Sequence, residues 1–278
     1  MRRTTALVPI FVLGASLPAA AQTTLTPQIS GNTLAANISL PGDIEADLTI
    51  TFEQAVGLNA NALSLTAGLV NPMDTSFFSR FPDPTSVSIP TAFPVLLRID
   101  PTAASGLSFS GVYRLTLHTH NLNLTTNSPL RLYKAASGGP FQDITAAVDA
   151  GSVRPGGDGG AYSEFLVVVD IRPTDSVISG KFARLNNDLA ANGSAISPAV
   201  LADLQQRLAA AKDLYMQGQI ASAINAVQAF ADQVKQQSGA NIPDVWRANG
   251  NLVNVAGLLR SDASTLKFSL TWKANGAP

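Results

Sequence analysis

His118 and His120 are the two histidines of the 278-residue chain, and a single residue separates them. If this segment is a β-strand, the i, i+2 spacing places both imidazole rings on one face, where two nitrogens could share a metal ion. Zinc sites use three or four protein ligands, and the sequence places no third ligand beside this pair. We therefore favour surface histidines over a metal site, on the solvent face of the strand with Arg114 and Thr116.

Aspartates are the second group of candidate metal ligands. Calcium takes oxygen ligands and is common in exported modules, but none of the aspartates lies in the D-x-D-x-D-G pattern of a self-contained calcium loop. Asp158, in the glycine-rich segment 156–160, joins the two histidines as a candidate metal ligand. We expect no cofactor, with calcium as the open alternative. The aspartates considered for calcium are Asp100, Asp143, Asp149, Asp158 and Asp170.

No motif in the chain identifies an enzyme. Segment 156–160 lacks the Lys-Ser or Lys-Thr pair and the following helix of a phosphate-binding loop, so we interpret it as a hairpin loop. Ser163 lies outside any G-x-S-x-G elbow, and the chain has no cysteine to act as a nucleophile or a thiolate ligand. The catalytic residues are therefore unknown. A glycosidase pair of carboxylates stays open, because such pairs meet only in the folded protein.

The N-terminal residues 1–21 have the organisation of a secretory signal peptide. Arg2 and Arg3 precede an apolar run that ends at Leu17, and three alanines follow. The run is shorter than the roughly 20 residues of a transmembrane helix, and no later segment could span a bilayer. We expect an extracytoplasmic protein, periplasmic or secreted, that begins near Gln22. A formal net charge of −1 with 13% charged residues argues against a nucleic-acid ligand.

Residues 22–173 predict an antiparallel β-sandwich, the scaffold that would position these candidates. Apolar and polar residues alternate from Ile44 to Phe52, so one face of that strand is expected to be buried. Phe165 to Val169 is almost continuously apolar, which is typical of a strand covered on both faces. The loops 71–94 and 156–160 are long for a sandwich, and long loops often carry function.

Residues 174–262 predict a small helical bundle. Its centre is a helical hairpin, in which apolar residues recur at spacings of three and four on both sides of Gly218. The same spacing predicts a first helix over 178–189 and a last helix over 245–259. Within the tail 263–278, Leu266 to Trp272 alternates strictly between apolar and polar residues, so we predict a strand that docks on the sandwich. The predicted fold class is α+β with several domains.

The segment from Leu201 to Leu259 resembles the FIMAH-type helical domain of bacterial adhesins and extracellular hydrolases. The resemblance lies in an alanine-rich first helix and in Gly218, Ala223-Ile224-Asn225, Phe230, Val234, Gly239, Leu252 and Ala256 to Leu259. It implies an accessory role beside or within cell-surface proteins, and it carries over no functional residue because the shared positions are core positions. The whole chain, including segments 128–132 and 162–165, is also similar to an uncharacterised family of exported bacterial proteins.

These features favour an exported, non-catalytic binding or adhesion-type protein of the bacterial cell envelope. We expect its partner to be an envelope protein or a polysaccharide, and the protein to be a monomer without an integral membrane segment once the signal is removed. The alternative is a hydrolase of envelope or extracellular polysaccharide, for which the sequence identifies no catalytic residue.

Overall fold

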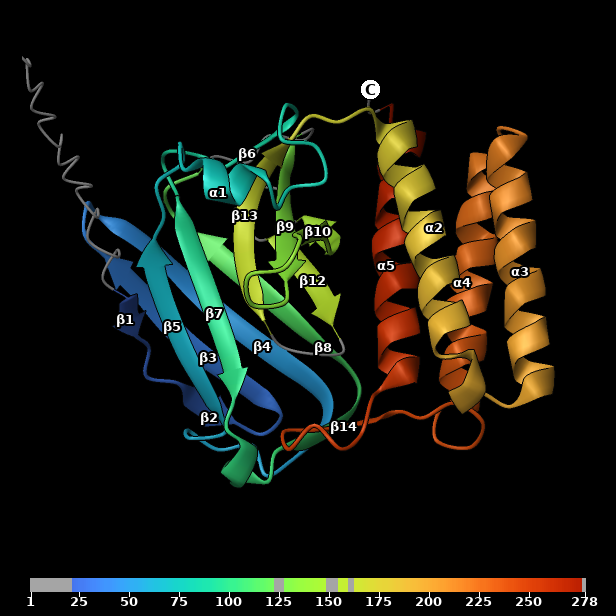
Figure 1. Ribbon diagram of the computed structural model, residues 1–278, viewed down its shortest axis with the longest axis horizontal. Coiled ribbons are helices and arrows are strands. Elements are labelled where there is room, and N and C mark those ends of the chain that lie inside the picture. The colour runs from blue at the N-terminus through green and yellow to red at the C-terminus, as the bar shows by residue number, and fades with distance from the viewer. Residues whose placement is uncertain (1–21, 123–127, 149–154, 160–162, 277–278) are drawn as a thin grey trace, which may run out of the picture.

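A computed structural model describes residues 22–122, 128–148, 155–159 and 163–276, with the backbone alone for 155–159. The predicted signal peptide lies outside these ranges. The described residues form two antiparallel sheets of seven strands each and five α-helices, one of them a single turn. In Figure 1 the two sheets lie face to face, and the four long helices stand together beside them.

The first sheet contains a central strand that is buried on both faces. In spatial order it consists of β1 (Gln22–Thr24), β5 (Leu63–Leu69), β7 (Val95–Pro101), β13 (Glu164–Asp170), β9 (Leu130–Ala135) and β10 (Gln142–Asp143), with β6 (Val87–Ser88) paired to the end of β13.

The second sheet carries the two histidines. In spatial order it consists of β11 (Thr145–Val148), β12 (Pro155–Gly159), β8 (Ser108–Thr119), β4 (Ile44–Val56), β3 (Thr33–Leu40) and β2 (Gln28–Ser30), with β14 (Val245–Arg247) paired to β8. Short 3-10 helices occur at Ala103–Ser105 and Gly193–Ala195.

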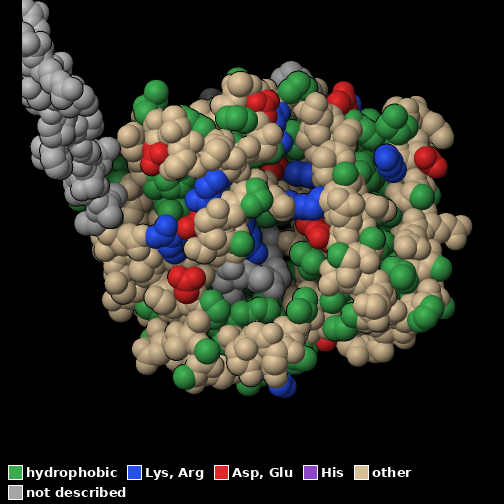
Figure 2. Space-filling view, in the orientation of Figure 1, with side chains coloured by type: hydrophobic (Ala, Val, Ile, Leu, Met, Phe, Trp, Pro, Cys, Tyr) green, Lys and Arg blue, Asp and Glu red, His purple; other side chains and the backbone are tan. Residues whose placement is uncertain are grey.

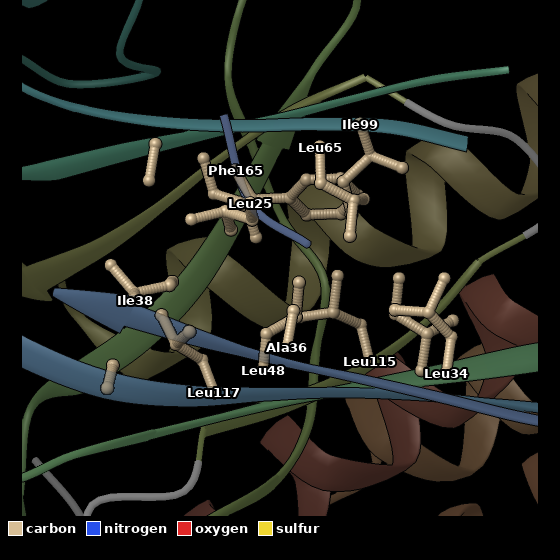
Figure 3. Packing of buried hydrophobic residues seen from close by; sticks show 14 of the residues in the cluster. Leu25, Leu34, Ala36, Ile38, Leu48, Leu65, Ile99, Leu115, Leu117 and Phe165 are labelled. Carbon is tan, nitrogen blue, oxygen red and sulfur yellow. The ribbon is translucent and has the colours of Figure 1, made fainter. Parts of the chain in front are cut away.

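The core lies between the two sheets, as the alternating pattern predicts. Leu65, Ile99 and Phe165 of the first sheet face Leu48 and Leu115 of the second (Figure 3), and all five are nearly inaccessible to solvent. Residues on the other face of β4 are more exposed. Burial of each large apolar side chain contributes about 1.5–3 kcal/mol as an upper estimate, so this layer is the main source of stability in the sandwich.

The proline-rich segment 71–94 covers the outer face of the first sheet. It contains α1 (Thr75–Phe78) and β6, and its Phe81 lies in a second hydrophobic cluster with Leu166 and Val168 of β13. β13 is therefore buried on both faces, as predicted, and the segment is a packed layer rather than a free binding loop.

Residues 156–159 of the glycine-rich segment lie in a strand, so their interpretation as a hairpin loop is wrong. Pro155–Gly159 forms β12, which pairs with both β8 and β11. Glycines have a low strand propensity, but here two neighbouring strands supply hydrogen bonds for the backbone. A glycine-rich strand also lets another element approach closely, and a helix of the bundle packs against β12.

The bundle consists of α2 (Thr174–Ala191), α3 (Pro198–Met216), α4 (Ile220–Gln237) and α5 (Val255–Ala274). The predicted helical hairpin is confirmed: α3 and α4 pack on each other, and Gly218 between them has a φ of +75° that suits glycine. The predicted first helix lies within α2. Among the described residues, none of the helices combines the length and the apolar character needed to cross a membrane.

The last helix begins later than predicted. Residues 245–247 form β14 and extend the second sheet, and Leu252 lies in the loop before α5. The apolar residues of 245–259, whose spacing predicted a single helix, therefore belong to β14, to the loop after it and to the start of α5. This return of the chain to the sandwich places α5 against β8, β11 and β12 as well as against α2 and α4.

The predicted C-terminal strand is also wrong, because Leu266 to Trp272 is helical within α5. Leu266 and Leu270 lie four residues apart and are buried in the bundle core. Phe268 and Trp272, also four apart, lie against the Arg131 guanidinium of the sandwich. The helix is buried on two sides, and each side uses one pair of apolar residues four apart. Because the two pairs are offset by two residues, apolar residues recur at every second position, as they do in a strand.

Candidate functional site

The structure supplies a third candidate ligand beside the histidines. Asp47 on β4 lies directly opposite His118 of β8. Its Oδ2 atom is 3.6 Å from His118 Nδ1 and 3.9 Å from His120 Nε2. The alternation of β4 already placed Asp47 on the exposed face, but the sequence does not encode the register that brings it to the histidines.

Asp158 is separated from the two histidines. The pairing of β12 with β8 places it opposite Arg114, four residues along the strand from His118. At about 3.4 Å per residue, this position is too far along the strand for Asp158 to share an ion with the histidines. Asp100, Asp143 and Asp170 do not converge on one ion within the described part of the chain, and Asp149 lies outside it.

A buried ion pair joins the sandwich to the helices. The Lys181 ammonium of α2 lies 2.6 Å from the Asp143 carboxylate of β10, and both side chains are almost fully buried. Lys181 also donates to the Thr265 hydroxyl at 2.6 Å and the Ser269 hydroxyl at 2.9 Å, both on α5. One cation therefore holds three elements together.

Both members of this pair are charged at neutral pH. Burial alone would raise the pKa of Asp143, but the positive charges of Lys181 and Arg131 hold it below its usual range. Burial lowers the pKa of Lys181 to about 8, which still leaves it mostly protonated at pH 7.

Beside this pair lies a cavity of about 430 Å³ between the sandwich and the helices. Figure 2 shows a hollow at this boundary, with basic and acidic side chains at its rim. The cavity has a charged side and an apolar side. The residues of the charged side include Lys134, Arg184, Asp188 and Asp262, and those of the apolar side include Trp246, Leu252, Val253 and Leu258.

The charged side contains a carboxyl pair. Burial, a hydrogen bond with Asp262 and the negative charge of Asp262 raise the pKa of Asp188 to about 7. Arg184 binds one oxygen of Asp262 at 2.5 Å. The other oxygen, Oδ2, is buried and accepts no hydrogen bond among the described residues. Because the pKa of Asp188 lies near neutral pH, Asp188 carries its proton in part of the molecules at pH 7 and can then act as a hydrogen-bond donor beside Asp262.

Lys134 lies on the same side of the cavity, and the pKa of its ammonium group is lowered. Its side chain is partly exposed, and desolvation lowers the pKa of its ammonium group to about 8. Arg184 lowers the pKa further, while Asp262 opposes the shift. The cavity therefore offers both a donor and acceptors to a ligand.

The apolar side comes from the chain that returns to the sandwich. Trp246 of β14 lies 5.1 Å, centroid to centroid, from Phe109 of β8. Leu252 and Val253, in the loop that follows, are 38% and 61% exposed. Apolar side chains next to a cavity are available to cover the apolar part of a ligand.

The sequence contains no local signal for this cavity. Its ionisable residues come from β9, α2 and α5, which are far apart in the chain, and each also fits an ordinary surface position of its own element. The spacing of Asp188 and Asp262 therefore carries no motif, because the packing of α2 on α5 brings these two residues together and the docking of the helices on the sandwich adds Lys134.

The chain belongs to a family of unknown function (DUF6689), whose model matches residues 9–274. No curated protein and no solved structure matches it. Family membership therefore covers nearly the whole chain but assigns no activity, and the chemistry of the cavity is the guide to function.

Proposed function

We propose that this DUF6689 protein binds a small amphipathic molecule in the cavity between the sandwich and the helices. It would do so as an exported, non-catalytic binding protein of the bacterial cell envelope. The observation that carries the proposal is the arrangement of the cavity, in which an apolar wall faces Asp188 and Asp262, and the pKa of Asp188 is raised to about 7. Ligand sites are often mostly apolar cavities of about 300–1,000 Å³ between domains, with a few polar groups for orientation.

The polar groups define one end of the ligand. The unpaired Oδ2 atom of Asp262 needs a hydrogen-bond donor, and Asp188 supplies one only while it is protonated. A ligand hydroxyl or ammonium group could replace that proton as the donor. The other end of the ligand would be apolar and lie against Trp246, Leu252 and Val253.

Two sequence features support the envelope setting. Residues 1–21 have the pattern of a signal peptide. The resemblance of 201–259 to a FIMAH-type domain suggests an accessory role among cell-surface proteins. Under this proposal the sandwich and the bundle together form the binding unit, and the physiological ligand is part of, or released from, an envelope component.

A hydrolase is the second candidate, and the same carboxyl pair favours it. A carboxyl with a pKa near neutral pH, such as Asp188, can act as a general acid beside a second carboxylate. Glycosidases, however, separate their two carboxyls by about 5–9.5 Å, whereas the carboxyls of Asp188 and Asp262 lie close enough for Asp262 to raise the pKa of Asp188 directly. Arg184 also holds Asp262 as a fixed acceptor, a role that suits ligand orientation.

Saturation-transfer NMR with three probes of similar size tests the proposal: benzylamine, benzyl alcohol and benzoate. We expect the amine and the alcohol to bind and benzoate not to bind, because its carboxylate would meet the acidic pair. Leu258→Trp should fill the cavity and abolish binding, whereas Met216→Trp, at a residue that is 71% exposed and outside the cavity lining, should leave it unchanged. Equal signals from all three probes, or binding that survives Leu258→Trp, would contradict the proposal.

The hydrolase is tested separately with glycan and ester substrates. Turnover that is lost in Asp188→Asn but kept in the exposed-site variant Asp100→Asn would favour the hydrolase over the binding protein.

A further inference from the structure

We propose that Asp47, His118 and His120 form a binding site for a divalent transition-metal ion, and that zinc is the ion that fits. The site lies on the exposed face of the second sheet and shares no residue with the cavity lining. The inference is therefore independent of the proposed function.

The backbone brings the three side chains together without a loop. Asp47 and His118 are cross-strand partners on β4 and β8, and His120 lies two residues further on the same face of β8. One ligand atom from each residue lies within 4.8 Å of the other two. The two imidazole centroids are 4.6 Å apart. Within the described part of the chain, this is the group of three such side chains that meets these distances.

These separations are close to those of a zinc site. Bonds of about 2.0–2.1 Å in tetrahedral geometry place ligand atoms roughly 3.3–3.5 Å apart. The Asp47 oxygen is 3.6 and 3.9 Å from the two histidine nitrogens. Side-chain rotations that bring the three ligand atoms closer together would enclose an ion. The strands themselves need not move.

A neighbouring residue orients the carboxylate. Asn37 of β3 lies opposite Asp47 and donates a 2.7 Å hydrogen bond to Asp47 Oδ1. The other oxygen, Oδ2, is the one that faces both histidines. Metal-binding carboxylates and histidines are commonly held by such outer hydrogen bonds. Asn37, Asp47 and His118 thus form a row across three adjacent strands, in which Asn37 orients Asp47 toward His118.

The ligand chemistry selects the class of ion. Two imidazoles and one carboxylate suit zinc and other first-row divalent ions, whereas calcium and magnesium prefer sites made of oxygen alone. The side chains of His118, Asp47 and His120 are 24%, 50% and 58% exposed. Solvent can therefore reach the ion, and water or a group from another molecule would complete its coordination.

Isothermal titration calorimetry of the tag-free protein with zinc chloride tests the site. We expect one equivalent of zinc per chain, and loss of that binding in His118→Ala, His120→Ala and Asp47→Asn. Asn37→Ala, which removes only the orienting hydrogen bond, should weaken the affinity by about 10- to 100-fold. Asp100→Asn changes an exposed aspartate of the first sheet in the same way as Asp47→Asn and should bind zinc like the unchanged protein.

A second measurement needs no variant. His118 and His120 are the two histidines of the chain, so ¹⁵N-detected imidazole spectra contain signals from these two rings alone. Zinc should shift both sets of signals at one equivalent, and magnesium should shift neither. Zinc binding that is unchanged in the histidine variants, imidazole signals that do not respond, or an equal affinity for magnesium would overturn the proposal.

Discussion

The side-chain amide of Asn254 donates a 2.6 Å hydrogen bond to the carbonyl oxygen of Gly111, which lies 143 residues earlier in the chain. The Asn254 Oδ1 atom accepts a second bond of 2.6 Å from the backbone N–H of Gly257 and so caps the first turn of α5. A Cβ atom on Gly257 would lie 2.5 Å from the same Gly111 oxygen. The Asn254 amide therefore holds the start of α5 against β8, and the lack of a side chain at Gly257 allows the two backbones to approach closely.

Asn254→Ala should destabilise the protein by about 2–4 kcal/mol, because it removes a helix cap worth about 1 kcal/mol and leaves a carbonyl without its donor at about 1–3 kcal/mol. Urea unfolding measures the change. Asn249→Ala, in the exposed loop before α5, is the matched control and should change stability by less than about 0.5 kcal/mol. Equal effects of the two substitutions would show that the bond to Gly111 contributes nothing.

Gly257→Ala should also destabilise the protein, although alanine is the better helix former by about 1 kcal/mol. The added methyl group would collide with the backbone of β8 and with Asn254, so α5 must shift away from the sandwich. Gly180→Ala, within α2 where a Cβ would meet nothing within 4 Å, is the control and should stabilise. A stabilising effect at both positions would contradict the close approach of α5 to β8.

Removing the Lys181 ammonium should destabilise the protein strongly. Lys181→Met leaves the Asp143 carboxylate buried without its cation, which typically costs about 3–5 kcal/mol. The double variant Lys181→Met/Asp143→Leu removes both members of the ion pair, so a large part of that loss should be recovered, although Arg131 also loses the charge of Asp143. Lys212→Met, at an exposed position of α3, is the control for the substitution itself. A double variant less stable than Lys181→Met would show that Asp143 is stabilised by other groups.

The stability of the protein should depend on the protonation of Asp188. Its pKa is 3.8 for the unperturbed carboxyl and about 7 in the folded protein. Between these values the folded state binds a proton that the unfolded state releases, so this contribution is full below about pH 4 and is lost as the pH rises through 7. Because Asp188 is partly exposed, screening limits the effect to about 1–2 kcal/mol.

Asp188→Asn isolates this contribution, since asparagine does not titrate. The free energy of unfolding, measured from pH 4.5 to 7.5 for both proteins, should fall more steeply with pH in the unchanged protein. Other titrating groups affect both curves alike and cancel in the difference. Parallel curves would show that Asp188 ionises normally and carries no proton in the cavity at neutral pH.

Arg131 and Trp272 should be energetically coupled. The Arg131 guanidinium carbon lies 4.4 Å from the centroid of the Trp272 ring, and Arg131 is almost fully buried. A double-mutant cycle with Arg131→Met and Trp272→Leu should give a coupling of about 0.5–2 kcal/mol. A coupling of zero would mean that the C-terminal turns of α5 do not hold this face against the sandwich.

The amino-acid sequence by itself determined the elements that bury a single face, because their apolar residues then follow one period. The alternation of Ile44 to Phe52 reflects one buried and one exposed face, and it appears as β4. The helical hairpin around Gly218 has a single apolar stripe on each helix and a glycine in the left-handed region between them. In both cases the local spacing and the buried face agree, so the pattern had one interpretation.

Only the tertiary structure decided where a helix packs against two different neighbours, which residues face each other across strands, and which helices meet. Leu266 to Trp272 alternates because α5 is buried between the bundle and the sandwich, and period alone cannot distinguish two buried helix faces from one buried strand face. Asp47 meets His118 through strand register, and Asp188 meets Asp262 through helix docking. Charged side chains carry no periodic signal, because their pairing follows from long-range packing rather than from spacing along the chain.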